Sequence, residues 1–182
     1  MKVPLLPVLF SVLLTNAALG QENSNFERKP DIVSLGLGLG FDYGGIGASL
    51  LYYPQKNIGL FFGGGYAIAG FGYNAGLKLR LSSEKPTVVS PFIMAMYGYN
   101  AAVAVSGNSS YDKLFYGPSF GAGIDIRSKK PSSRGYLSIG LLVPVRSPDV
   151  NNYMNDLETN NGVSFSNLPP IGFSIGYRFL LN

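Results

Sequence analysis

Residues 34–43, SLGLGLGFDY, alternate a large apolar residue with a small or polar one along their whole length. A period of two places alternate side chains on opposite faces of a β-strand, so this segment predicts a strand. Its apolar face carries Leu35, Leu37, Leu39, Phe41 and Tyr43, and its other face carries Ser34, Gly36, Gly38, Gly40 and Asp42. Glycine weakens a strand, so a face lined with glycine needs a physical reason.

The same alternation recurs along the chain and predicts eight strands, at residues 31–43, 44–53, 58–68, 71–81, 88–105, 114–127, 135–146 and 171–180. Eight sequential strands with short links predict an all-β fold, an eight-stranded antiparallel up-and-down β-barrel. The apolar face of each predicted strand is free of charge. The charged strand residues fall on the opposite face, where we expect an interior polar network of Asp42, Lys78, Arg80, Asp125, Arg127, Arg146 and Arg178.

Two kinds of barrel fit this pattern. In a lipocalin-like barrel the large apolar face points inward, and the glycine face would meet water. In a transmembrane barrel the apolar face meets lipid, where an Arg or Lys at the midplane costs about 2–4 kcal/mol. Glycines inside a narrow barrel leave room for long Arg and Lys side chains, so the pattern favours the transmembrane barrel. Two aromatic girdles are then expected, one of Phe41, Tyr43, Tyr66, Phe71, Tyr73, Tyr99 and Tyr116, the other of Tyr52, Tyr177 and Phe179.

The pattern of residues at the N-terminus is typical of an export signal. Lys2 precedes the apolar run VPLLPVLFSVLL, and small residues then lead into a polar stretch. This order is typical of a secretory signal peptide, with cleavage after Gly20. We therefore expect a cleaved signal peptide at 1–20, a periplasmic N-terminal segment at 21–30 and an outer-membrane β-barrel at 31–182.

Composition excludes several chemistries. The chain has neither cysteine nor histidine, which removes disulfides, thiolate metal sites and most general-base catalysis. Its net charge of +4 is too small and too dispersed to indicate nucleic-acid binding. The motif GPSFG at 117–121 matches G-x-S-x-G, but that chemistry needs a histidine partner, so Ser119 reads as a small interior residue. We predict no catalytic residues, no cofactor and no metal.

The interior charges allow two interpretations. They form either a selectivity constriction for anions or a salt-bridged plug that satisfies buried polar groups. An eight-stranded interior is just wide enough for side chains, which favours the plug. Asp42 and Asp125 are expected near opposite ends of the barrel, which argues against a paired-carboxylate hydrolase.

One connection stands apart from the others in length. Residues 147–170 form the one long loop, with a short helix expected at 149–158, whereas the links rich in Lys, Ser and Pro are short. We expect the short turns in the periplasm and the long loop outside the cell. Long loops in compact domains are usually functional or disordered, so 147–170 is the candidate recognition element, with 106–113 as a lesser one.

The girdled strands, the signal peptide and the terminal IGFSIGYRFLLN resemble small eight-stranded bacterial outer-membrane β-barrels. These are the outer-membrane protein X type and the barrel half of outer-membrane protein A. The resemblance implies a monomer in outer-membrane lipid, with a last strand that the barrel-assembly machinery reads. Ile175, Tyr177 and Phe179 match that last-strand pattern, although the chain ends in Leu180, Leu181 and Asn182 and not in an aromatic residue.

The function expected from the sequence is a structural or surface-interaction role without catalysis, exerted through an unknown surface partner. Three alternatives stay open. They are a secreted lipocalin-like binder of apolar ligands, a narrow pore, and a lipid-modifying barrel enzyme that uses a Ser/Lys pair.

Overall fold

The computed structural model describes residues 31–81, 88–105, 109–129, 133–166 and 168–181. The expected signal peptide and the segment 21–30 lie outside the described residues. The strands are β1 (Val33–Gly40), β2 (Gly45–Tyr52), β3 (Ile58–Ala67), β4 (Gly70–Arg80), β5 (Val89–Val103), β6 (Lys113–Arg127), β7 (Gly135–Pro144) and β8 (Gly172–Leu180).

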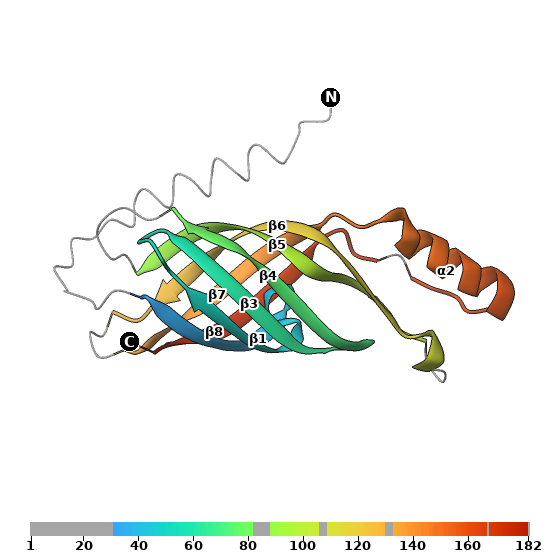
Figure 1. The fold of residues 1–182 in the computed structure, drawn as a ribbon, viewed down its shortest axis with the longest axis horizontal. Helices are drawn as coiled ribbons and strands as arrows, with labels where there is room; N and C mark the ends of the chain where they lie inside the picture. Colours follow the sequence, from blue (N-terminus) through green and yellow to red (C-terminus); the bar gives the residue numbers. More distant parts are fainter. Residues whose placement is uncertain (1–30, 82–87, 106–108, 130–132, 167, 182) are drawn as a thin grey trace, which may run out of the picture.

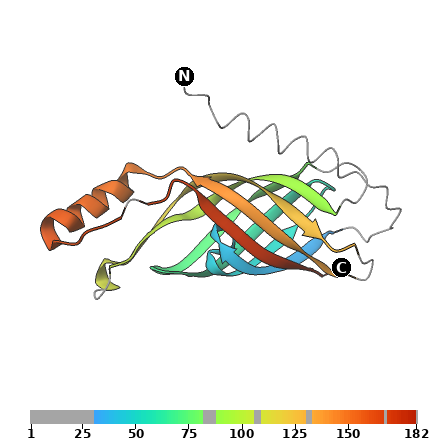
Figure 2. The same cartoon turned by 180° about the vertical axis from the view of Figure 1, so that it is seen from behind.

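The eight strands form one closed barrel. Each strand pairs antiparallel with its neighbour in sequence, and β1 also pairs with β8, which closes the cylinder (Figure 1). The predicted all-β, eight-stranded, up-and-down antiparallel barrel is therefore confirmed. The C-terminus lies at the end of the barrel away from the helix α2 (Pro148–Asn161), as Figure 2 shows from behind.

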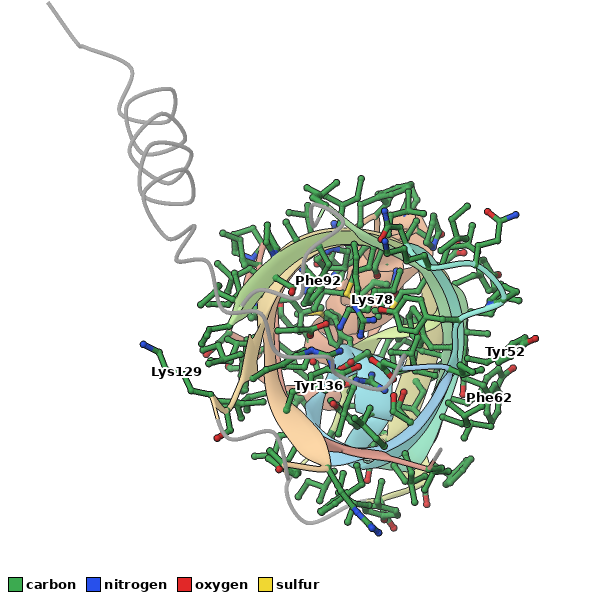
Figure 3. All side chains as sticks on the ribbon, turned by 90° about the vertical axis from the view of Figure 1, so that its left-hand side faces the viewer. Tyr52, Phe62, Lys78, Phe92, Lys129 and Tyr136 are labelled. Carbon is green, nitrogen blue, oxygen red and sulfur yellow. The ribbon has the colours of Figure 1, made fainter. Side chains whose placement is uncertain are left out.

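The two faces of the strands differ as the alternation predicts. On β1, Leu37 is 53% exposed, whereas Ser34 and Gly36 are buried. Viewed along the barrel, Lys78, Phe92 and Tyr136 lie inside the cylinder, and Tyr52 and Phe62 point away from it (Figure 3). The large apolar side chains thus form the outer surface of the barrel, and small, charged and some aromatic side chains fill its interior.

The connection between β1 and β2 departs from the expected strand. β1 ends at Gly40, and the chain then folds into the barrel as the single 3-10 turn η1 (Phe41–Tyr43). The left-handed backbone that reverses the chain falls on Gly44 and Gly45, with φ of 69° and 109°, where a side chain would be strained. We call η1 with Gly44 the inward turn.

The inward turn corrects two assignments to the aromatic girdle. Tyr43 is completely buried, and Phe41 packs against buried residues of the lumen. A third correction follows at Tyr99, which packs edge-to-face on Phe41 with 5.3 Å between ring centroids. Its strand shifts register between Tyr99 and Ala101, so the simple alternation ends there. These three aromatic rings line the inside of the barrel and not its outer rim.

Two strands continue past the barrel wall. β4 pairs with β5 only as far as the Asn74–Gly98 pair, and β7 pairs with β6 only as far as the Ser119–Pro144 pair. Beyond those points residues 99–103 of β5 and 113–118 of β6 form a hairpin of their own. α2 projects past the same end of the barrel (Figure 1). A helix was expected at 149–158 and is confirmed, extended by one residue at its start and three at its end.

This projecting part has its own small core. Val150 and Leu157 of α2 are 1% and 3% exposed, and they cluster with Ala101, Val103 and Phe115 of the hairpin. We call the hairpin residues 99–103 and 113–118 together with α2 the arm. The helix begins at the cap residue Ser147, whose hydroxyl accepts a hydrogen bond from the backbone N–H of Asp149. The segment expected as a loop is therefore a folded element packed on the β5–β6 hairpin.

Candidate functional site

A network of ion pairs lies inside the barrel. Lys78 of β4 lies with its Nζ 2.7 Å from Oδ1 of Asp125 on β6, and it donates a second hydrogen bond to Ser138 at 3.1 Å. Both charged side chains are almost wholly buried. The Lys78 ammonium also lies 3.7 Å from the ring centroid of Phe92, a distance suited to a cation–π contact.

A second group of charges shares the carboxylate of Asp31. Arg80 donates a hydrogen bond to this carboxylate, and Nη2 of Arg127 lies 2.8 Å from its Oδ2. Arg80 also donates to the hydroxyl of Tyr136 at 3.0 Å and lies over the ring of Tyr53. Asp31 thus joins β4 to β6 across the barrel.

The sequence pattern missed Asp31 as a member of the network. Asp31 lies four residues before Leu35, so a strict alternation would turn its side chain outward, as it does those of Leu35 and Leu37. β1 begins only at Val33, however, so the strand alternation does not extend to Asp31. Tyr53 follows Leu51 on the inner face that the alternation predicts for residues 44–53, but the predicted network named only charged residues and so did not include it.

A third group is built around the inward turn. Asp42 accepts a hydrogen bond from Ser174 and pairs with Arg178 at 3.3 Å, and Arg178 also donates to Ser49 at 3.3 Å. Asn74 donates to the backbone oxygen of Phe41 at 2.6 Å and so holds the turn from the opposite wall. Because the turn folds inward, Asp42 lies beside Ser174 and Arg178 and not at the rim of the barrel, where the extended strand would have left it.

Arg146 does not join the other six predicted members. It follows the end of β7, and its guanidinium donates to the backbone oxygens of Pro169 at 2.7 Å and Leu168 at 3.4 Å. Arg146 therefore ties down the chain that returns from α2 to β8. The prediction failed here because the strand ends at Pro144, two residues earlier than the alternation indicated.

An apolar layer fills another part of the interior. It consists of Leu51, Tyr53, Phe61, Phe92, Met94, Met96 and Leu142, with Phe41 of the inward turn packed against it. Charged groups and apolar side chains thus share the lumen. The Ser119 hydroxyl is buried within the same interior, and the hydrogen bonds described for Lys78 go to Asp125 and Ser138.

The interior glycines make room for Tyr43. A methyl group added at Gly36 would lie 3.0 Å from an atom of the Tyr43 ring, and one added at Gly176 would lie closer still. A methyl group added at Gly38 would lie 2.8 Å from the ring but closer, at 2.5 Å, to the backbone oxygen of Ile175. Contacts this short are not tolerated without displacement of the ring. The glycines of β1 therefore leave space for the Tyr43 ring. Tyr43 lies seven residues after Gly36, and the inward turn brings its ring back against the inner face of β1.

The fold and its interior define a class of protein: a closed, eight-stranded, up-and-down β-barrel whose lumen is occupied by its own side chains. No family model matches the chain, and no curated protein matches it. Within the described residues, no helix has the length and apolar character needed to cross a membrane. In the described part of the chain, no group of three or more acidic side chains is placed so that it could hold a metal ion.

Proposed function

We propose that this protein is an integral outer-membrane β-barrel whose sealed body anchors the arm at the cell surface for recognition of a surface partner. The observation that carries the proposal is the sidedness of the strands. Among the charged residues of the described strands only Lys113 is exposed, and it belongs to the arm. The rest of the outer surface carries exposed Leu, Ile, Val, Phe and Tyr side chains. Such a band is costly in water and favourable in lipid.

The filled interior argues against the lipocalin-like alternative. A barrel that binds apolar ligands needs an apolar cavity, whereas here the lumen holds ion pairs and tightly packed rings. Lys78 and Arg178 are almost wholly buried in this lumen, so its interior is charged as well as filled. A secreted barrel would also expose its apolar outer belt to water.

The same interior argues against the pore alternative. The ion-paired groups, the apolar layer and the inward turn lie in the path that a solute would follow. The plug interpretation of the interior charges therefore accounts for more of the described contacts than a selectivity constriction does.

The arm is the part of the molecule best suited to recognition. A folded surface element presents its side chains in one arrangement, so a partner that binds it loses less conformational entropy. α2 buries Val150 and Leu157 against the hairpin and leaves its Asn, Asp, Glu and Thr side chains exposed. The arm also lies at the end of the barrel opposite the C-terminus.

Cell fractionation with a gel-mobility assay tests the location. We expect the untagged protein to fractionate with the outer membrane, and its mobility on a denaturing gel to shift when the sample is boiled. Recovery as a soluble periplasmic protein, in the absence of detergent, would overturn the proposed location.

Protease treatment of intact cells tests the orientation. We expect added protease to cleave the arm and to leave the barrel fragment intact. Protection of the arm in intact cells, with cleavage only after lysis, would place the arm in the periplasm and contradict the proposed surface role.

A further inference from the structure

The lumen holds an uneven set of charges. Among the described residues it contains four cations, Lys78, Arg80, Arg127 and Arg178, and three carboxylates, Asp31, Asp42 and Asp125. Three of the cations lie within hydrogen-bond distance of Asp31 or Asp125. Arg178 pairs with Asp42 at 3.3 Å, and the other oxygen of Asp42 accepts a hydrogen bond from Ser174. Among these described residues the lumen therefore carries one more positive than negative charge.

The guanidinium of Arg178 is incompletely satisfied by protein groups. Its Nη2 donates to Asp42 and Ser49, whereas Nε and Nη1 have no hydrogen-bond partner in the described part of the chain. The side chain is only 1% exposed. Arginine does not lose its proton in proteins, so burial cannot be relieved by neutralisation. Asp42 thus pairs with only one side of this buried guanidinium, and the donors Nε and Nη1 call for a second acceptor.

Two further unpaired donors accompany Arg178. The hydroxyls of Ser34 and Tyr43 are buried and have no hydrogen-bond partner among the described residues. Gly36 connects the three groups, because it pairs with Arg178 across the strands and follows Ser34 by two residues on the same inner face. A Cβ atom at Gly36 would lie 3.1 Å from the Tyr43 hydroxyl and 3.2 Å from Cγ of Arg178.

We propose that the lumen binds one small monovalent anion, such as chloride, beside Nε and Nη1 of Arg178, with the Ser34 and Tyr43 hydroxyls as additional donors. The single excess cation among the described lumen residues matches a monovalent ion. The donors are enclosed by the barrel wall, so the ligand is a free inorganic ion and not a lipid headgroup. The inference rests on the lumen alone and holds wherever the barrel resides in the cell.

Thermal unfolding of the purified full chain in sodium chloride and in sodium gluconate, at equal ionic strength, tests this site. We expect the wild-type chain to unfold at a higher temperature in chloride, because a ligand that binds only the folded state stabilises it. Arg178→Gln abolishes this difference and Ser34→Ala reduces it. Arg127→Gln is the matched control, since it removes a lumen cation that binds Asp31 and leaves Nε and Nη1 of Arg178 in place, and it retains the difference. Equal unfolding temperatures of the wild type in the two salts would overturn the proposal.

Crystals grown in bromide provide a direct test that does not depend on the variants. We expect an anomalous peak within hydrogen-bond distance of Nε or Nη1 of Arg178. A map with only water at that position overturns the site, even if chloride stabilises the protein elsewhere. The site is also overturned if both Arg178→Gln and Ser34→Ala keep the full wild-type difference in unfolding temperature between chloride and gluconate.

Discussion

Gly176 and Gly140 lie on the inner faces of neighbouring strands, but a methyl group would meet different surroundings at the two positions. At Gly176 it would overlap the ring of Tyr43, whereas at Gly140 its nearest neighbour is an atom of Phe92 at 3.6 Å, an ordinary contact. We expect Gly176→Ala to lower the free energy of unfolding by about 1–3 kcal/mol, the usual cost of overpacking. Gly140→Ala should change it far less. Chemical denaturation of both variants measures the difference.

The same experiment in a Tyr43→Ala background identifies the cause. Without the ring, most of the cost of Gly176→Ala should disappear, because the two positions are in contact and their effects are not additive. An unchanged cost in that background would show that the methyl group is excluded by the backbone and not by Tyr43.

At Lys78 we expect the cost to come from removing a side chain and not from adding one, because the buried carboxylate of Asp125 needs its partner. We expect Lys78→Met to destabilise the barrel by about 3–5 kcal/mol, since it leaves a buried carboxylate without its main partner. The double variant Lys78→Met, Asp125→Leu should recover most of that loss, because neither charge of this pair remains buried. Unfolding midpoints of the single and double variants check this prediction, and a double variant as unstable as the single one would contradict it.

At the scale of the elements, the arm should unfold without the barrel. Its core is separate from the lumen, and residues 99–103 of the hairpin pair in the ladder only with residues 113–116. Leu157→Asp places a charge in that core, where the leucine side chain is 3% exposed. We expect faster protease cleavage of the arm and an unchanged mobility shift of the barrel on boiling. Asn155→Asp, on the exposed face of the same helix, is the control and should leave cleavage unchanged.

The alternation predicts all eight strands because a buried inner face and an apolar outer face impose a period of two wherever the chain is paired on both sides. It fails where the chain leaves the ladder. Phe41 and Tyr43 continue the alternation of β1 in sequence, yet they belong to a turn that folds inward. Asp31 precedes β1, and Arg146 follows β7. The missed or misplaced members of the network therefore lie at strand ends, where the alternation no longer predicts whether a side chain points into the barrel or out of it.

A signal for the inward turn is nevertheless present in the sequence. The pair Gly44–Gly45 directly follows FDY, and two successive glycines permit the left-handed backbone that the reversal uses. The sequence does not reveal that this turn points into the barrel. That direction depends on the glycines of β1 and β8, which are brought opposite one another only when the cylinder closes.

For the whole molecule, the proposed membrane location predicts that a charged side chain on the outer surface of the barrel is unfavourable. Leu37→Arg places a charge at mid-strand, where the side chain is exposed. We expect it to cost about 2–4 kcal/mol in a bilayer and to reduce the amount of assembled barrel. Leu37→Ala, which removes the same side chain without adding charge, should assemble normally. The boiled and unboiled fractions of each variant in isolated membranes provide the measurement, and equal assembly of Leu37→Arg and Leu37→Ala would speak against a lipid-facing surface.

The inward turn also constrains the order of events during folding. The Tyr43 ring lies against Gly36 and Gly38 of the first strand and Gly176 of the last, so it sits directly behind the seam at which the two ends of the sheet zip together. Once that seam has closed, the ring could reach its place only by passing down a cylinder already occupied by side chains. The tyrosine must therefore be seated while the sheet is still an open, curved ribbon. Zipping of the seam is then the step that locks it in.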